Sequence, residues 1–122
     1  FGNSTFVAVG QNGTILRSTN NGSSWSNSSP GGNTLWAVTF ENNIFMAVGT
    51  GGRIVKSTDN GSNWSSSTSG TSEILRGITF GNNIFMAVGD EGTIVKSTDN
   101  GTSWSSLTSG TTNDLNGVTF GD

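Results

Sequence analysis

Ser57-Thr58-Asp59-Asn60-Gly61-Ser62-Asn63-Trp64 is a stretch that recurs in this chain as Ser97-Thr98-Asp99-Asn100-Gly101-Thr102-Ser103-Trp104. A third version, Ser18-Thr19-Asn20-Asn21-Gly22-Ser23-Ser24-Trp25, has Asn20 in the Asp position. Asp and Asn side chains accept hydrogen bonds from nearby backbone N–H groups, and glycine adopts a positive φ without strain. The tryptophan can cover the turn with its ring, although its indole N–H then needs an acceptor. Each stretch therefore predicts a tight corner that leads into a strand.

The three stretches belong to a longer internal repeat. Phe1, Phe40, Phe80 and Phe120 fall 39, 40 and 40 residues apart, and an Ala-Val-Gly sequence keeps the same spacing. Since no linker interrupts the repeats, we predict that 1–122 is a single domain of three repeats of about 40 residues.

Each repeat contains four strand-like segments separated by turn residues. In the second repeat these are 35–40, 44–48, 53–58 and 64–69. The second segment is apolar throughout, the third is half apolar, and the fourth is nearly all Ser and Thr. This gradient from buried to polar is typical of a propeller blade followed from its inner to its outer strand. No stretch has the 3.6-residue apolar period of a helix.

The corner stretches resemble the Asp-box, or BNR repeat, of sialidases and related β-propellers. The pattern of the whole repeat is similar to that of the photosystem II assembly factors in the same family. The motif's Thr position differs, since Ser24, Asn63 and Ser103 occupy it. The resemblance implies an all-β propeller with four-stranded blades, three of them in this chain. It also implies a structural function for the Asp-box residues, which are Ser18, Asn20, Gly22, Trp25, Ser57, Asp59, Gly61, Trp64, Ser97, Asp99, Gly101 and Trp104.

The ends of the chain are out of phase with the blades. The sequence starts at Phe1, where a first strand would end, and 114–120 has the pattern of a first strand with no blade behind it. We therefore expect 114–120 to complete the first blade of another copy by strand exchange, in a ring formed by oligomerisation. A homodimer with six blades is favoured over a trimer with nine. A monomeric β-trefoil is the alternative fold.

The residue inventory excludes most catalytic chemistry. The chain has no His, Cys or Tyr, which excludes Ser–His and Cys–His nucleophiles, His/Cys zinc sites and the Tyr nucleophile of sialidases. Arg17, Arg53 and Arg76 lie at different repeat positions, unlike a repeated arginine triad. We interpret Asp90 and Glu91 as solvated turn charges. The sequence therefore predicts no enzyme activity, no catalytic or metal-binding residues and no cofactor.

Binding residues are expected where the repeats differ. Trp36, Arg76 and Asn116 occupy one equivalent position at the start of the first strand of a repeat. These side chains suit stacking on a sugar and hydrogen bonds to its hydroxyls, although the position can also simply tolerate variation. The net charge of −3 disfavours nucleic acid, and no apolar run is long enough to span a membrane.

We predict a non-enzymatic, self-assembling structural or protein-interaction scaffold. A carbohydrate-binding lectin that uses clefts between blades is the alternative. The expected partners are further copies of the chain, together with a protein or a glycan.

Overall fold

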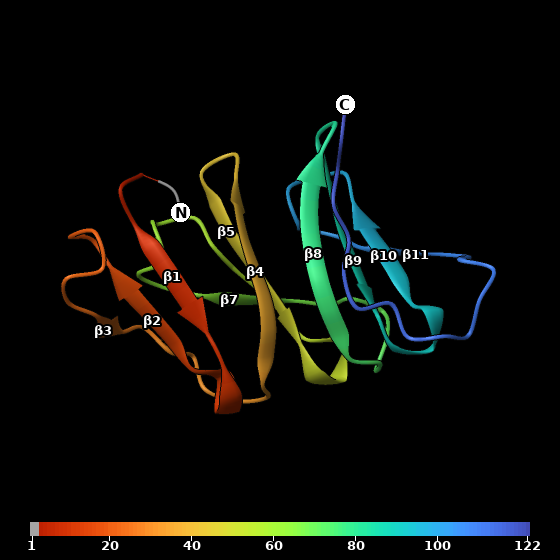
Figure 1. The fold of residues 1–122 in the computed structure, drawn as a ribbon, viewed down its shortest axis with the longest axis horizontal. Coiled ribbons are helices and arrows are strands. Elements are labelled where there is room, and N and C mark those ends of the chain that lie inside the picture. The colour runs from red at the N-terminus through yellow and green to blue at the C-terminus, as the bar shows by residue number, and fades with distance from the viewer. Residues whose placement is uncertain (1–2) are drawn as a thin grey trace.

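The structure, a computed structural model, describes residues 3–122, so the predicted repeat position at Phe1 lies outside the described residues. The strands form three separate antiparallel sheets. Figure 1 shows these sheets standing side by side, each built from consecutive strands. The predicted all-β arrangement of blades is confirmed. The β-trefoil alternative is wrong, because the strands do not form one closed barrel.

The three sheets follow the three sequence repeats, and we call them blades 1, 2 and 3. Blade 1 has three strands in the order β1-β2-β3, whereas blades 2 and 3 have four each, β4-β5-β6-β7 and β8-β9-β10-β11. In the described residues, blade 1 therefore has no strand equivalent to β4 or β8. The strands are β1 (Phe6–Val9), β2 (Ile15–Ser18), β3 (Ser26–Asn27), β4 (Leu35–Glu41), β5 (Ile44–Gly49), β6 (Ile54–Ser57), β7 (Ser65–Ser67), β8 (Leu75–Gly81), β9 (Ile84–Gly89), β10 (Ile94–Ser97) and β11 (Ser105–Leu107).

Burial in blade 2 falls from the second strand to the fourth, as the sequence pattern predicted. Every residue of β5 is buried, whereas β7 is mostly exposed. The equivalent strand β9 differs, because Ile84 and Met86 are only partly buried. Among residues 3–122, no other blade covers these two side chains, which line a cavity beside residues 118–120.

Pairs of residues with positive φ close the hairpins β1–β2, β5–β6 and β9–β10. Glu91 and Gly92, for example, have φ values of 55° and 69°. Two successive positive φ values are the geometry of a type I′ turn, whose twist matches the strands on either side. The hairpins coincide with three short 3-10 turns, Gln11–Gly13, Thr50–Gly52 and Asp90–Gly92.

The apolar core lies between neighbouring blades. One cluster joins Ile15 of blade 1 to Leu35, Ala47 and Val55 of blade 2, with Trp64 packed against it. A second cluster joins blades 2 and 3 and consists of Ile44, Met46, Val48, Ile54, Leu75, Phe85, Ala87 and Val95. Burial of apolar area between facing sheets therefore holds the blades together.

Residues 114–120, which we predicted to be a strand, contain no strand in the structure. A β-strand is stabilised by hydrogen bonds to a neighbouring strand. This segment lies alongside β8 but belongs to none of the three sheets (Figure 1). A Cβ added to Gly77 of β8 would meet the Gly117 Cα at 3.1 Å, which shows how closely the two backbones approach.

One hydrogen bond defines the position of the C-terminal segment relative to blade 3. The Leu115 N–H donates to the Gly89 carbonyl at 2.9 Å. The equivalent bond between blades 1 and 2 runs from the Leu35 N–H to the Gly10 carbonyl at 3.0 Å. Since Leu35 begins the first strand of blade 2, Leu115 lies beside blade 3 where the first strand of a following blade would begin.

Candidate functional site

The corners Ser18–Trp25, Ser57–Trp64 and Ser97–Trp104, called corners 1, 2 and 3, share one hydrogen-bond network. In corner 2 the Ser57 hydroxyl donates to Asp59 Oδ1 at 2.7 Å and accepts from the Gly61 N–H at 2.9 Å. Asp59 Oδ1 also accepts from the Asn63 N–H at 2.8 Å, and Trp64 Nε1 donates to the Gly61 carbonyl at 3.2 Å. Corner 3 repeats these bonds, and corner 1 repeats them with the Asn20 amide oxygen in place of a carboxylate.

The carboxylates of corners 2 and 3 are held in their charged form. Hydrogen bonds from the Asn63 N–H, the Asn63 amide and the Ser57 hydroxyl lower the pKa of Asp59 to about 2. The Ser103 hydroxyl and N–H, followed by the Ser97 hydroxyl, lower the pKa of Asp99 to about 2 as well. A carboxylate with so low a pKa is a poor general acid or base near neutral pH.

Corners 2 and 3 also contact the blade that precedes them in the chain. Arg17 Nε of blade 1 donates to the Asn60 carbonyl of corner 2 at 2.6 Å. Lys56 Nζ of blade 2, at the equivalent position, lies 3.5 Å from both the Asn100 carbonyl and Thr102 Oγ1 of corner 3. A basic side chain on β2 or β6 thus binds the corner of the following blade.

The structure brings together two of the three predicted ligand residues. The Arg76 guanidinium carbon lies 6.0 Å from the centre of the Trp36 ring. Trp36 is 52% exposed, and its Nε1 donates to Thr50 Oγ1 at 3.0 Å. Asn116 is exposed on the C-terminal segment, and no hydrogen bond or ring contact among residues 3–122 joins its side chain to the other two. Binding at these residues remains a prediction.

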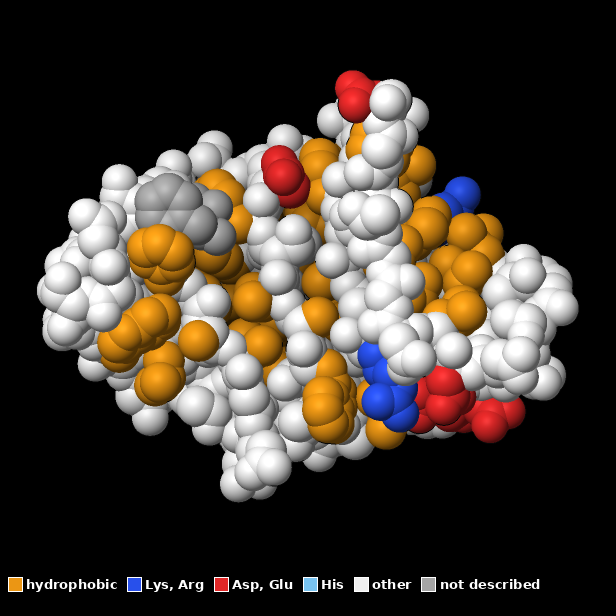
Figure 2. Space-filling model, in the orientation of Figure 1, with side chains coloured by type: hydrophobic (Ala, Val, Ile, Leu, Met, Phe, Trp, Pro, Cys, Tyr) orange, Lys and Arg blue, Asp and Glu red, His pale blue; other side chains and the backbone are white. Residues whose placement is uncertain are grey.

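Asp90 is not the solvated turn charge that we expected. Arg76 Nε donates to Asp90 Oδ1, and Arg76 Nη2 donates to Asp90 Oδ2 at 3.1 Å. The hydrogen bond to Asp90 is the main cause that raises the pKa of Arg76. Figure 2 shows basic and acidic side chains side by side near the lower end of β8. The sequence offered one signal of this pair. Asp90 has Gln11 and Thr50 as its equivalents in the other repeats, so position 90, like position 76, varies from repeat to repeat.

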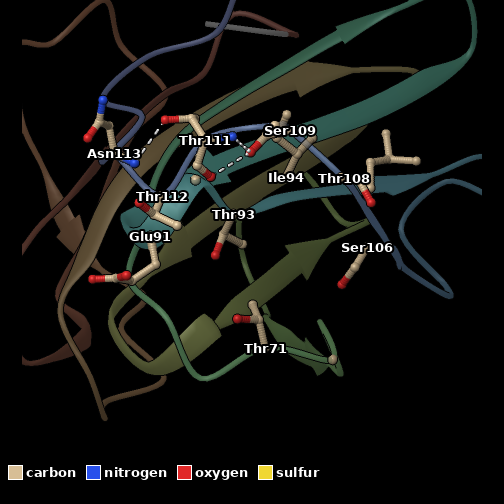
Figure 3. Close-up of a pocket in the computed structure, with 14 residues that line it drawn as sticks. Thr71, Glu91, Thr93, Ile94, Ser106, Thr108, Ser109, Thr111, Thr112 and Asn113 are labelled. Carbon is tan, nitrogen blue, oxygen red and sulfur yellow. Dashed lines mark hydrogen bonds between the residues drawn. The ribbon is translucent and has the colours of Figure 1, made fainter.

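Two hollows lie at equivalent places on blades 2 and 3. The hollow on blade 3 has a volume of about 760 Å³, and Figure 3 shows hydroxyl groups of Thr93, Ser109 and Thr111 along its wall. Its counterpart on blade 2 measures about 500 Å³ and is lined by Arg53, which occupies the position of Thr93. Burial lowers the pKa of Arg53, whose Nη1 donates to the Asn33 carbonyl at 2.8 Å. In the hollow on blade 3, the Ser109 hydroxyl donates to the Thr111 carbonyl at 3.1 Å, and the Thr111 hydroxyl accepts from the Asn113 N–H at 3.0 Å.

The described residues contain no group of three or more acidic side chains placed to hold a metal ion. The same residues form no helix that is long and apolar enough to cross a membrane.

Comparison with known proteins places the fold in the β-propeller class. A solved structure described as YCF48 bound to D1 peptide superposes with a TM-score of 0.70 at 24% sequence identity, over 83% of this chain and 35% of that one. A second, YCF48 from Cyanidioschyzon merolae, superposes with a TM-score of 0.66 at 24% identity, over 83% of this chain and 32% of that one.

The chain thus spans about a third of the length of the solved structures that it resembles. No protein-family model matches the sequence, and no curated protein matches it either. The similarity therefore shows the fold, which is that of a partial propeller.

Proposed function

We propose that this chain is a non-enzymatic protein-interaction scaffold, and that a second copy of it completes a six-bladed ring. The observation that carries this proposal is the difference between blade 1 and the other two blades. β5 and β9 each pair with a further strand, β4 or β8, whereas among residues 3–122 no strand pairs with their counterpart β1 on that side. An exposed sheet edge favours the addition of another strand. The C-terminal segment of a second copy, residues 114–120, has the repeat position that this edge requires.

The comparisons support the protein-binding part of the proposal. YCF48, which shares the fold, has been solved with a D1 peptide bound. The residue inventory supports the non-enzymatic part, because the chain has no His, Cys or Tyr. We further propose that the three corners are Asp-box motifs with a structural function, since their side chains bond mainly to one another and to the backbone of the turn.

Thermal unfolding over a wide range of protein concentration tests self-assembly. If a second copy completes blade 1, the unfolding midpoint rises with concentration, because mass action stabilises whatever binds the folded chain. Deletion of residues 114–122 should remove this dependence on concentration. A midpoint that is independent of concentration in the full chain would refute self-assembly.

Carbohydrate binding is the second candidate function. The hydroxyl-lined hollow of blade 3 and the exposed ring of Trp36 favour it, since aromatic rings and hydroxyl groups both suit sugars. A glycan array with the purified chain separates the two candidates. The scaffold proposal predicts no bound glycan, whereas a lectin would bind a glycan that a Trp36→Ala variant no longer retains.

A further inference from the structure

The two internal interfaces between blades follow one pattern. In each, a corner glycine packs on a strand of the preceding blade, β1 or β5. A Cβ added to Gly61 of corner 2 would meet Val7 Cγ2 at 3.2 Å, and one added to Gly101 of corner 3 would collide with the methyl group of Met46. Val7 and Met46 occupy the same repeat position, as do Arg17 and Lys56, which bind the carbonyls of Asn60 and Asn100.

We call the side of blade 3 that points away from blade 2 its outer face. This face carries the groups that such an interface requires. Met86 and Lys96 are the equivalents of Met46 and Lys56. Met86 is partly exposed whereas Met46 is 0% exposed, and the side-chain Nζ of Lys96 has no hydrogen-bond partner among residues 3–122. A cavity of about 210 Å³ lies on this face between β9 and residues 118–120.

The outer face of blade 1, which points away from blade 2, carries the corner side of this pattern: a corner and an apolar surface that would pack on a preceding blade. Leu16 is 36% exposed, whereas its equivalents Val55 and Val95 are 1% and 0% exposed. Trp25 of corner 1 is 45% exposed, and Gly22 is only partly buried although Gly61 and Gly101 are buried. Figure 2 shows apolar side chains gathered at both ends of the molecule, over β1 and β2 and again over β9 and β10.

We propose that the outer face of blade 3 binds the outer face of blade 1 of a second copy, head to tail. Lys96 Nζ then donates to the Asn21 carbonyl of the second copy, and Met86 packs on its Gly22. This inference rests on the proposed self-assembly and specifies the surface that performs it. The occupant is a second copy because each outer face repeats the side chains that already meet face to face inside the chain.

The space around Gly10 is a second, independent observation that supports the same interface. A Cβ on the equivalent residues Gly49 and Gly89 would lie under 3.0 Å from the carbonyls of Thr34 and Ile74, which lead into β4 and β8. A Cβ on Gly10 would meet nothing within 4 Å. The backbone at Gly10 is extended, with φ at −169°, so alanine fits there in the single chain.

In the proposed assembly, the segment that leads into 114–120 of the second copy takes the place held by Thr34 and Ile74. The backbone of the second copy's Asp114 then lies against Gly10. We therefore expect an alanine at position 10 to leave the single chain unaffected and to block the binding of a second copy.

Sedimentation equilibrium of the full 122-residue chain and four single variants tests the inference. Lys96→Glu removes the donor to the Asn21 carbonyl, and Gly10→Ala obstructs the incoming segment. Each should weaken self-association by at least about tenfold. Lys96→Arg is the matched control, because Arg17 makes the equivalent bond in blade 1. Gly121→Ala is the second control, since a Cβ there meets nothing within 4 Å.

The outcomes are distinct. Weakened association in Lys96→Glu and Gly10→Ala, with both controls unchanged and all four variants folded by circular dichroism, supports the interface. Unchanged association in both test variants overturns it, while self-assembly by another surface stands. A parent chain that sediments only at 12.6 kDa overturns the proposed self-assembly together with this inference. A parent chain that forms no self-complex but binds an unrelated strand peptide at β1 also overturns it.

Discussion

Replacement of Ser97 by alanine should destabilise the fold by about 1–3 kcal/mol, because it leaves a buried donor without an acceptor. Ser97 is 2% exposed, and its hydroxyl accepts from the buried Gly101 N–H at 2.8 Å while it donates to Asp99 Oδ1 at 2.8 Å. Alanine removes both bonds and offers nothing to the Gly101 N–H. Since small domains are stable by roughly 5–15 kcal/mol in total, the loss is large.

Urea unfolding at one fixed protein concentration measures this effect. With a slope of about 1–3 kcal/mol per molar urea, the midpoint should fall by roughly 1 M. Ser106→Ala is the matched control, because Ser106 is exposed on β11 in the same blade, and its change should stay within about 0.5 kcal/mol. Equal midpoints for the two variants would show that the Ser97 hydroxyl does not hold the corner together.

Further predictions concern acid stability, packing and activity. The pKa of Asp59 and of Asp99 is about 2 in the folded chain against an ordinary value of 3.8, so the stability that these carboxylates contribute is complete above about pH 4 and is lost as the pH falls towards 2. A variant with both Asp59→Asn and Asp99→Asn should therefore lose stability less steeply over this pH range. An acid unfolding profile identical to that of the parent would contradict the assignment. Gly89→Ala should destabilise the chain by about 1–3 kcal/mol through overpacking against the Ile74 carbonyl, whereas Gly10→Ala should leave the unfolding of the single chain unchanged; circular dichroism at low protein concentration compares the two. A sialoside substrate should not be turned over, and turnover that disappears when one of the chain's own carboxylates is replaced would refute the non-enzymatic assignment.

Local patterns were sufficient to predict the strands and turns. Apolar runs such as 44–48 and the Gly-Gly pair after them indicated a buried strand followed by a hairpin, and the structure has β5 and a turn with two positive φ values there. Such features depend on residues close in sequence, and for that reason sequence reasoning reaches them.

Contacts between distant residues were beyond these patterns. The ion pair of Arg76 with Asp90 crosses from the first strand of blade 3 to the hairpin after its second strand, so neither residue's own neighbours indicate it. The bond from Arg17 to the Asn60 carbonyl depends on how two blades pack. Residues 114–120 have a strand-like sequence, yet strand formation requires hydrogen bonds to a neighbouring strand, and no strand among residues 3–122 pairs with this segment.

The central claim is that two copies of this chain together form one ring of blades. Light scattering coupled to size-exclusion chromatography measures the molar mass of the assembly directly. We expect a single species with twice the 12.6 kDa mass of one chain, and a shift towards the single chain on dilution in Lys96→Glu but not in Lys96→Arg. A compact, folded species of 12.6 kDa at all concentrations would contradict the account.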